Sequence, residues 1–154
     1  MANTKDYDPK KVVVTIGPYT AEGFADGTFI TVSRNNQAWN VVSGASGEHA
    51  RSKSNDLSGT FELTLMQTSA TNDILSQYMV LDETSNSGKF GIKIEDVNGG
   101  TTVFAIQAWV QQAPSVEYGK ELGDRVWTIE AGEIDYVVGG TDTVATKVSP
   151  VDFS

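Results

Sequence analysis

The chain has 154 residues and a formal charge of −9, with 20 acidic against 11 basic residues and no cysteine. Its length and its 39% hydrophobic content indicate one globular domain over residues 1–154. Without cysteine, the chain cannot form a disulfide scaffold, a thiol nucleophile or a thiolate metal site. The negative net charge argues against a surface that binds nucleic acid. The sequence shows no secretory signal and no apolar run of membrane-spanning length, so we expect a soluble protein made in the cytoplasm.

The first half of the chain is patterned for strands. A polar arm, residues 1–9, precedes a β-branched run at 10–16, and residues 28–34 alternate between apolar and polar side chains. A short strand is expected at 38–43. Residues 57–65 show the clearest period of two, which is typical of a strand with one buried face.

The second half contains the only strong helical pattern. Apolar residues at helical spacing predict an amphipathic helix over 69–81 that packs on a sheet. Residues 89–96 and 101–111 predict a hairpin whose turn is Asn98-Gly99, because these residue types adopt a positive φ easily. The second of these strands is apolar on both faces, and we expect it to be covered on both sides. A further strand is expected at 124–134.

These elements indicate a mainly β fold. We predict an antiparallel β-sandwich or barrel with one packed α-helix. The composition agrees, since 15 glycines and many Thr, Ser and Val residues favour strands and turns.

A polar segment, residues 44–59, interrupts the strand pattern. It carries His49, the only histidine, and two basic residues, Arg51 and Lys53, in an otherwise acidic chain. A compact domain rarely keeps so long a polar connection unless it is disordered or functional. We interpret it as a loop that orders on contact with another copy, where Arg51 and Lys53 pair with acidic groups.

Catalytic chemistry is not indicated. His49 lies among Gly, Ser and Ala, which do not hold an imidazole rigidly, so we interpret it as a surface residue. The stretch 96–100 resembles the start of a calcium loop, but Gln107 stands where the bidentate glutamate is required, and a hairpin turn explains these residues better. We expect no enzyme activity, no cofactor and no metal.

Several polar motifs occur in a particular order. Asn36-Gln37-Ala38-Trp39 precedes the polar stretch 47–56, then Ser58-Gly59-Thr60, then Gln67-Thr68-Ser69, which leads into 72–75. In this order the motifs resemble the tail tube proteins of contractile-tailed bacteriophages, over about residues 12 to 138.

The resemblance implies a β-sandwich whose long hairpins contribute to a ring-wide inner β-barrel. Six copies would form a ring, and stacked rings would form the hollow tail tube through which DNA is ejected without specific binding. The implied partners are other copies of the chain, the tail sheath, tape-measure, baseplate and tail-terminator proteins. The implied location is the virion tail, assembled in the host cytoplasm, with no membrane association.

Within this interpretation, 44–59 is an assembly loop, and the arms 1–9 and 139–154 dock on neighbouring copies. We expect inter-subunit contacts from Arg34, Glu48, Arg51, Lys53 and Asp56. The acidic residues expected to face the lumen are Glu62, Glu95 and Glu130, which lie on polar strand faces.

Three alternatives remain open on the sequence. The chain could form the tube of a non-contractile tail or of a secretion-like injection system. It could be a soluble β-barrel that binds a small apolar ligand in an interior lined by Trp109 and Trp127. It could also be a metal-free hydrolase that depends on His49.

Overall fold

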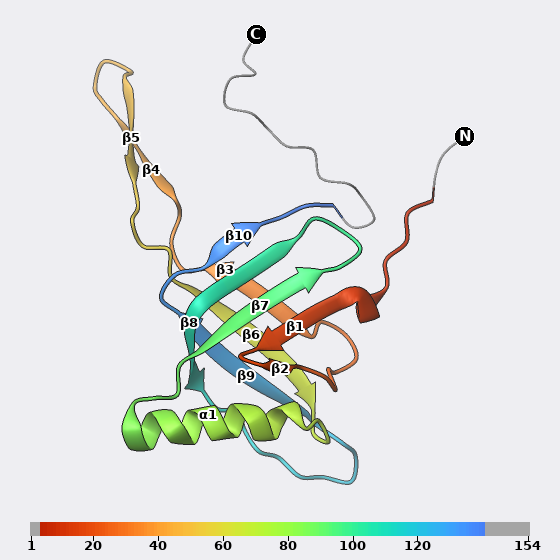
Figure 1. Cartoon of the computed structure of the whole chain (residues 1–154). Coiled ribbons are helices and arrows are strands. Elements are labelled where there is room, and N and C mark those ends of the chain that lie inside the picture. The colour runs from red at the N-terminus through yellow and green to blue at the C-terminus, as the bar shows by residue number, and fades with distance from the viewer. Residues whose placement is uncertain (1–3, 141–154) are drawn as a thin grey trace.

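The computed structural model describes residues 4–140, which form one large antiparallel sheet, a projecting hairpin and one α-helix (Figure 1). Seven strands of the large sheet follow the order β2-β1-β7-β8-β9-β6-β3, and β10 pairs with β8. The expected mainly β class with one packed helix is confirmed. The described strands do not close into a barrel, because β2 and β3 end this order without pairing to each other.

The large sheet folds over on itself into two layers. The front layer in Figure 1 contains β1 (Val12–Ile16), β2 (Tyr19–Thr20), β7 (Phe90–Asp96) and the start of β8 (Thr102–Gln112). We call it the β1-β7-β8 layer. Its strands are joined by antiparallel ladders, such as the pairing of Val14 with Ile94.

The second layer lies behind the first and contains β9 (Asp124–Ala131), β6 (Gly59–Met66) and β3 (Ile30–Arg34). We call it the β3-β6-β9 layer. β6 is its central strand and pairs with β9 along its whole length. It begins at Gly59 because a Cβ there would lie 2.6 Å from the carbonyl oxygen of Ser33, an approach that only glycine permits.

The core lies between the two layers. β6 and β7 alternate strictly between buried and more exposed positions, as the period-two pattern predicts. Their inward side chains form one cluster with buried side chains of β1, β8 and β9. The fully buried large side chains include Ile16, Phe61, Leu63, Leu65, Leu75, Ile92, Ile129 and Ile134.

The helix α1 (Thr71–Ser85) closes one end of the sandwich. It starts two residues later than the expected 69–81, because the Ser69 hydroxyl accepts a hydrogen bond from the Thr71 amide ahead of the first turn. It ends later because no glycine or proline interrupts it before Asn86, which adopts φ 54°. This helix is not long and apolar enough to cross a membrane.

Strand β8 differs from the expectation that it is covered on both faces. A bulge opposite Phe90 and Ile92 shifts the register, so that Ala105 and Ala108 both face the core. Ile106, between them, is 77% exposed, and Phe104 is also exposed. Within the described chain, the outer face of β8 is therefore apolar and open.

The turn between β7 and β8 is also longer than expected. Neither Asn98 nor Gly99 has a positive φ, so the two-residue turn is wrong. The Asp96 amide donates to the Thr101 carbonyl, and residues 97–100 make the connection. The Asp96 carboxylate accepts from the Asn98 amide, which provides a local alternative to the positive-φ turn.

The interpretation of residues 44–59 as a loop is wrong for about a third of its length. β4 (Trp39–Ser43) and β5 (His49–Lys53) pair as a separate two-stranded sheet that projects from the body (Figure 1). Only 44–48 form the turn, which the Gly44 amide closes on the Glu48 carbonyl at 2.7 Å. The strand was hidden in the sequence because none of its side chains is buried, so no burial period marks it.

The expected strand at 124–134 is divided. β9 ends at Ala131, and β10 (Asp135–Val137) continues past the irregularity at Gly132 to pair with β8. In the N-terminal arm, residues 4–8 are exposed, and a short 3-10 turn (Pro9–Lys11) leads into β1. Residues 1–3 and nearly all of the arm expected at 139–154 lie outside the described residues.

Candidate assembly surface

The rest of the described chain does not cover the projecting hairpin. Every residue of β4 and β5 is exposed, including Val41 at 69% and Val42 at 62%. A two-stranded hairpin without a packed face is only marginally stable in water. Its exposed apolar side chains therefore favour contact with another protein surface.

One face of the hairpin combines apolar and basic side chains. It carries the cross-strand pairs of Trp39 with Lys53 and Val41 with Arg51. The Arg51 guanidinium lies over the Trp39 ring at 4.0 Å from its centroid, a diagonal cation–π contact. This contact fixes the Arg51 guanidinium and the Trp39 indole relative to each other on a solvent-exposed surface.

The histidine on this hairpin is not part of a catalytic group. His49 Nδ1 lies 3.0 Å from the Ser43 hydroxyl, a hydrogen bond between facing residues beside the turn. Among the described residues, no acidic side chain forms a hydrogen bond or an ion pair with this imidazole. Among residues 4–140, no cluster of three His, Asp or Glu side chains could hold a metal ion.

A polar network fastens the root of the hairpin to the sheet. Asn35 donates to the Glu130 carboxylate at 2.7 Å, and the Thr60 hydroxyl donates to the other oxygen at 2.9 Å. Asn35 also donates to the Ser58 hydroxyl on the opposite leg of the root. Both legs of the hairpin are thereby tied to β9.

Asp56 adds a second tie between the two legs. Its carboxylate accepts hydrogen bonds from the Asn36 side chain and from the Ser58 amide. Hydrogen bonds from Ser58, and then from Asn36, lower the pKa of Asp56 because they stabilise the carboxylate. Asp56 therefore has a structural role at the root of the hairpin.

Arg34 is held inside the fold. Its guanidinium donates to the Ile134 carbonyl at 2.8 Å and lies 5.6 Å from the Tyr136 ring centroid. The Tyr136 hydroxyl in turn donates to the Val32 carbonyl, and burial raises the pKa of Tyr136. Arg34 Nε is buried and has no acceptor among the described residues. These contacts join β3 to β10.

The five residues expected at subunit contacts divide between the hairpin and its root. Glu48, Arg51 and Lys53 are exposed on the hairpin, whereas Arg34 and Asp56 lie at its root. The expectation that they make contacts between copies remains a prediction. The root network was not found from the sequence, because its partners lie up to 95 positions apart.

The three carboxylates expected in the lumen do not share one surface. Glu62 and Glu130 lie on the outer face of the β3-β6-β9 layer, where the pairing of Glu62 with Thr128 sets their register. Glu95 lies on the outer face of the other layer, 3.4 Å from Lys93 Nζ. A single tube wall can present only one of these two faces to its lumen.

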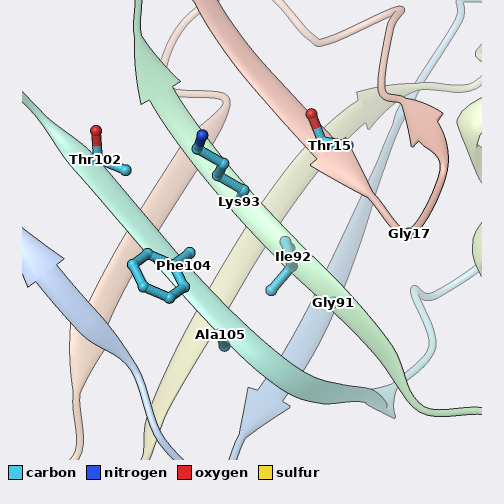
Figure 2. Close-up of a pocket in the computed structure, with 8 residues that line it drawn as sticks. All are labelled: Thr15, Gly17, Gly91, Ile92, Lys93, Thr102, Phe104 and Ala105. Atoms are coloured by element: carbon cyan, nitrogen blue, oxygen red, sulfur yellow. The ribbon is translucent and has the colours of Figure 1, made fainter.

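The outer face of the β1-β7-β8 layer contains an open hollow (Figure 2). It forms where Gly17 and Gly91 have no side chains, beside Phe104 and Ile92. Its polar side chains are Thr15, Lys93 and Thr102. This set lacks an acid–base pair, so the hollow presents an apolar contact surface instead of a catalytic site.

The interior also does not match a ligand-binding barrel lined by both tryptophans. Trp127 is 3% exposed and packed in the core, where its indole nitrogen donates to Asn72 at 2.8 Å. Trp109 lies instead beside a surface hollow with Ile106 and Glu133. The two indoles therefore do not line a common cavity.

Comparisons with known proteins identify relatives of the whole domain. The family model described as bacteriophage PhiTE tail tube protein matches residues 13–139. Structural protein ORF10 of Pseudomonas phage KPP10 is 26% identical over 155 residues, covering 96% of this chain and 87% of that protein.

Solved structures show the same fold at low sequence identity. The tube-terminating cap of the anti-feeding prophage matches with a TM-score of 0.60 and 12% identity, covering 89% of this chain and 94% of that one. The sheath/tube terminator of the extracellular contractile injection system PVC gives 0.59 and 13%, with 89% and 100% covered. A chain of the PVC sheath-tube complex gives 0.57 and 12%, with 86% and 91% covered.

Proposed function

Since the chain belongs to the family of PhiTE-type bacteriophage tail tube proteins, we propose that six copies form a ring and that stacked rings form the hollow inner tube of the phage tail. Genomic DNA passes through this tube during ejection. The family is structural and not an enzyme family, so the chain is a structural protein of the phage tail. Its assembly takes place in the host cytoplasm.

The projecting hairpin is the observation that carries the assembly proposal. It exposes Trp39, Val41 and Val42, and no other part of the described chain covers them. A neighbouring copy would bury these side chains and stabilise a hairpin that is marginal alone. The same contact, repeated from copy to copy with two complementary patches, closes a ring or extends a stack.

The chemistry of the two outer faces supports one orientation in the tube. The β3-β6-β9 layer presents mostly hydroxyls and carboxylates, such as Thr31, Ser33 and Glu62, which suit contact with water. The β1-β7-β8 layer presents Phe104 and Ile106, which suit contact with protein. We therefore assign Glu62 and Glu130 to the lumen wall and place Glu95 away from it.

The charge of the chain is compatible with DNA passage. Each copy contributes a formal charge of −9. Carboxylates on the lumen wall repel phosphates, so DNA would move along the wall without binding to it. This proposal needs no specific contact between the chain and a base or phosphate.

Open sheet edges provide a further reason for assembly. β3 ends the strand order on one side and β2 on the other, and an unpaired edge readily recruits another strand. Strand pairing between neighbours around the ring would satisfy these edges and extend the sheets into an inner barrel. β3 carries one charged residue, Arg34 at its end, so charge repulsion would do little to prevent such pairing.

The tail type and partners extend this proposal. We propose a contractile tail, because the similar solved chains come from contractile injection systems. A sheath would then surround the tube and a tape-measure protein would occupy it during assembly. Baseplate and terminator proteins would bind its two ends. The tube of a non-contractile tail is the competing assignment.

Electron microscopy of the purified chain tests the function. The wild-type chain is expected to form hollow tubes or six-fold rings, and Arg51→Glu with Lys53→Glu is expected to remain folded without forming them. The matched control, Arg51→Lys with Lys53→Arg, keeps both charges and should still assemble. Normal tubes from the charge-reversed chain would remove Arg51 and Lys53 from the assembly contact.

A further inference from the structure

We propose that the β4–β5 hairpin of one copy docks on the opposite end of the next copy, in the cleft between α1 and residues 113–123. This inference rests on the proposed tube and names the surface that receives the hairpin. We call that surface the acidic end. It is defined by α1 and by the segment 113–123, which connects β8 to β9.

The two surfaces lie at opposite ends of the molecule. Figure 1 shows the hairpin projecting at the top, while α1 and the connection before β9 lie at the bottom. A shift of one copy along this direction places its hairpin beside the acidic end of the next copy. Such a contact is head-to-tail and can repeat without limit, as growth of a tube requires.

The acidic end also exposes apolar side chains at the place where we dock the hairpin. In the segment 113–123, Val116 is 62%, Tyr118 79% and Leu122 71% exposed. A hollow lies between this segment and α1, lined by Met79, Pro114 and Tyr118 among others. Large exposed apolar side chains around a hollow indicate a contact surface.

The segment 113–123 is held in place by a buried cation. Arg125 is 7% exposed, donates to the Glu117 carbonyl and lies 5.4 Å from the Tyr118 ring centroid. The Gly123 amide also donates to the Gln67 side chain at 3.1 Å. These bonds shape the apolar residues into a preformed surface, which lowers the entropic cost of docking.

The charges of the two surfaces are complementary. α1 carries Asp73, Asp82 and Glu83 and has no lysine or arginine. The segment 113–123 adds Glu117 and Glu121 against Lys120. The hairpin, residues 39–53, carries Arg51 and Lys53 on its strands and one acidic residue, Glu48, in its turn.

Each surface also offers what the other lacks. The hairpin supplies a flat cation–indole pair, Arg51 over Trp39, with Val41 beside it. The acidic end supplies carboxylates around Tyr118 and Leu122. Apolar contact would contribute most of the affinity, and charge complementarity would select this partner and orient it.

Site-directed cross-linking tests the docking, because the chain has no native cysteine. One preparation carries Ser46→Cys in the hairpin turn, and a second carries Leu122→Cys at the acidic end. A third carries Thr128→Cys on the outer face of β9 as a matched control. Mixed subunits are assembled, treated with a short bis-maleimide, and compared with unassembled mixtures.

We expect a dimer of Ser46→Cys with Leu122→Cys in assembled samples only, and none with Thr128→Cys. Tubes that form normally but link Ser46→Cys to Thr128→Cys, or to neither partner, would overturn the docking and leave the tube proposal intact. A wild-type chain that forms neither rings nor tubes would instead overturn the proposed function, and the docking with it.

A charge swap provides an independent readout. Arg51→Glu with Lys53→Glu and Glu117→Lys with Glu121→Lys should each reduce the assembled fraction at least tenfold. Combining all four changes in one chain restores opposite charges across the proposed contact, and this chain should recover most assembly. If the chain with all four changes assembles no better than either double variant, direct pairing between these surfaces is contradicted.

Discussion

The Glu130 carboxylate accepts a hydrogen bond from the Asn35 side chain at 2.7 Å, across 95 positions of sequence. Glu130 lies on β9, in the body of the sheet, and Asn35 begins the leg that leads out to β4. Because the Thr60 hydroxyl bonds to the other oxygen of the same carboxylate, Glu130 joins three separate segments. The direction of the projecting hairpin therefore depends on a residue that is not part of it.

Replacing Glu130 should loosen the hairpin more than the fold. Glu130→Ala removes both charged hydrogen bonds, and we expect a loss of about 1 kcal/mol in the free energy of unfolding. Amide hydrogen exchange over residues 36–57 should accelerate, while exchange in β6 and β7 stays near the wild-type rate. Glu130→Gln, which keeps an acceptor, is the control and should show the smaller acceleration. Equal acceleration in the hairpin and the core would contradict a local role.

Trp39 separates assembly from folding. Trp39 is 40% exposed and lies outside the core, so Trp39→Ala should change the free energy of unfolding by no more than about 0.5 kcal/mol. Assembly should nevertheless fall sharply, because the substitution removes the stacking partner of Arg51. Trp39→Phe keeps an aromatic face and should assemble better. Sedimentation of tubes and urea unfolding measure the two effects, and an unfolded Trp39→Ala chain would refute the separation.

Truncation of a core side chain should produce the reverse pattern. Phe61 is fully buried between the layers, and Phe61→Ala should cost about 3–5 kcal/mol of unfolding free energy. Val42→Ala, an apolar truncation on the exposed hairpin, should leave the unfolding midpoint nearly unchanged. Chemical denaturation compares the two variants directly. A large loss from Val42→Ala would mean that the hairpin packs within its own chain.

Acid should weaken the hairpin root through Asp56. Its pKa is lowered in the folded chain, chiefly by Ser58, so its contribution is fully present above the ordinary carboxyl pKa. That contribution is lost as the pH falls through the lowered value, when the protonated carboxyl stops accepting both hydrogen bonds. The Asn36 and Ser58 amide resonances should titrate with this transition. Asp56→Asn should lack it, and an unchanged titration in that variant would assign the transition to another group.

Salt should distinguish the hairpin contact from the fold. Exposed charges are screened over about 8 Å at physiological ionic strength and over about 3 Å at 1 M salt. Raising the salt should therefore slow tube growth if Arg51 and Lys53 meet carboxylates of another copy. The unfolding midpoint should not fall in parallel, since the core is apolar. Growth that is unchanged or accelerates with salt would contradict ion pairing between copies by Arg51 and Lys53.

Elements with one buried face could be predicted from the sequence. Leu63 and Leu65 on β6, and Ile92 and Ile94 on β7, alternate with polar neighbours because one side of each strand faces the core. The helix was found for the same reason, since Leu75 and the partly buried Tyr78 and Met79 share one face. Burial leaves a period in the sequence, and the period identifies the element.

Features without a burial period could not be found in this way. β5 has five exposed residues, so nothing in His49–Lys53 distinguishes a strand from a loop. The bulge in β8 places Ala105 and Ala108 on the core face although they are three positions apart, which a strict alternation does not predict. The Glu130 network depends on contacts between distant segments, which residue types alone do not specify.

The composition of the segment 113–123 contains a signal of a contact surface. Val116, Tyr118 and Leu122 are apolar residues in a stretch rich in glycine and charge, where exposure is the rule. Apolar residues in such a segment suggest a contact made outside the domain. The sequence does not show that this segment lies beside α1, because the two are separated by β7 and β8 along the chain.

The most direct test of the account is the symmetry of the particles that the purified wild-type chain forms, measured by cryo-electron microscopy. We predict hollow tubes of stacked six-fold rings, with the hairpin of each copy buried against a neighbour. A chain that stays strictly monomeric at high concentration, and that no tail component induces to polymerise, would contradict the account.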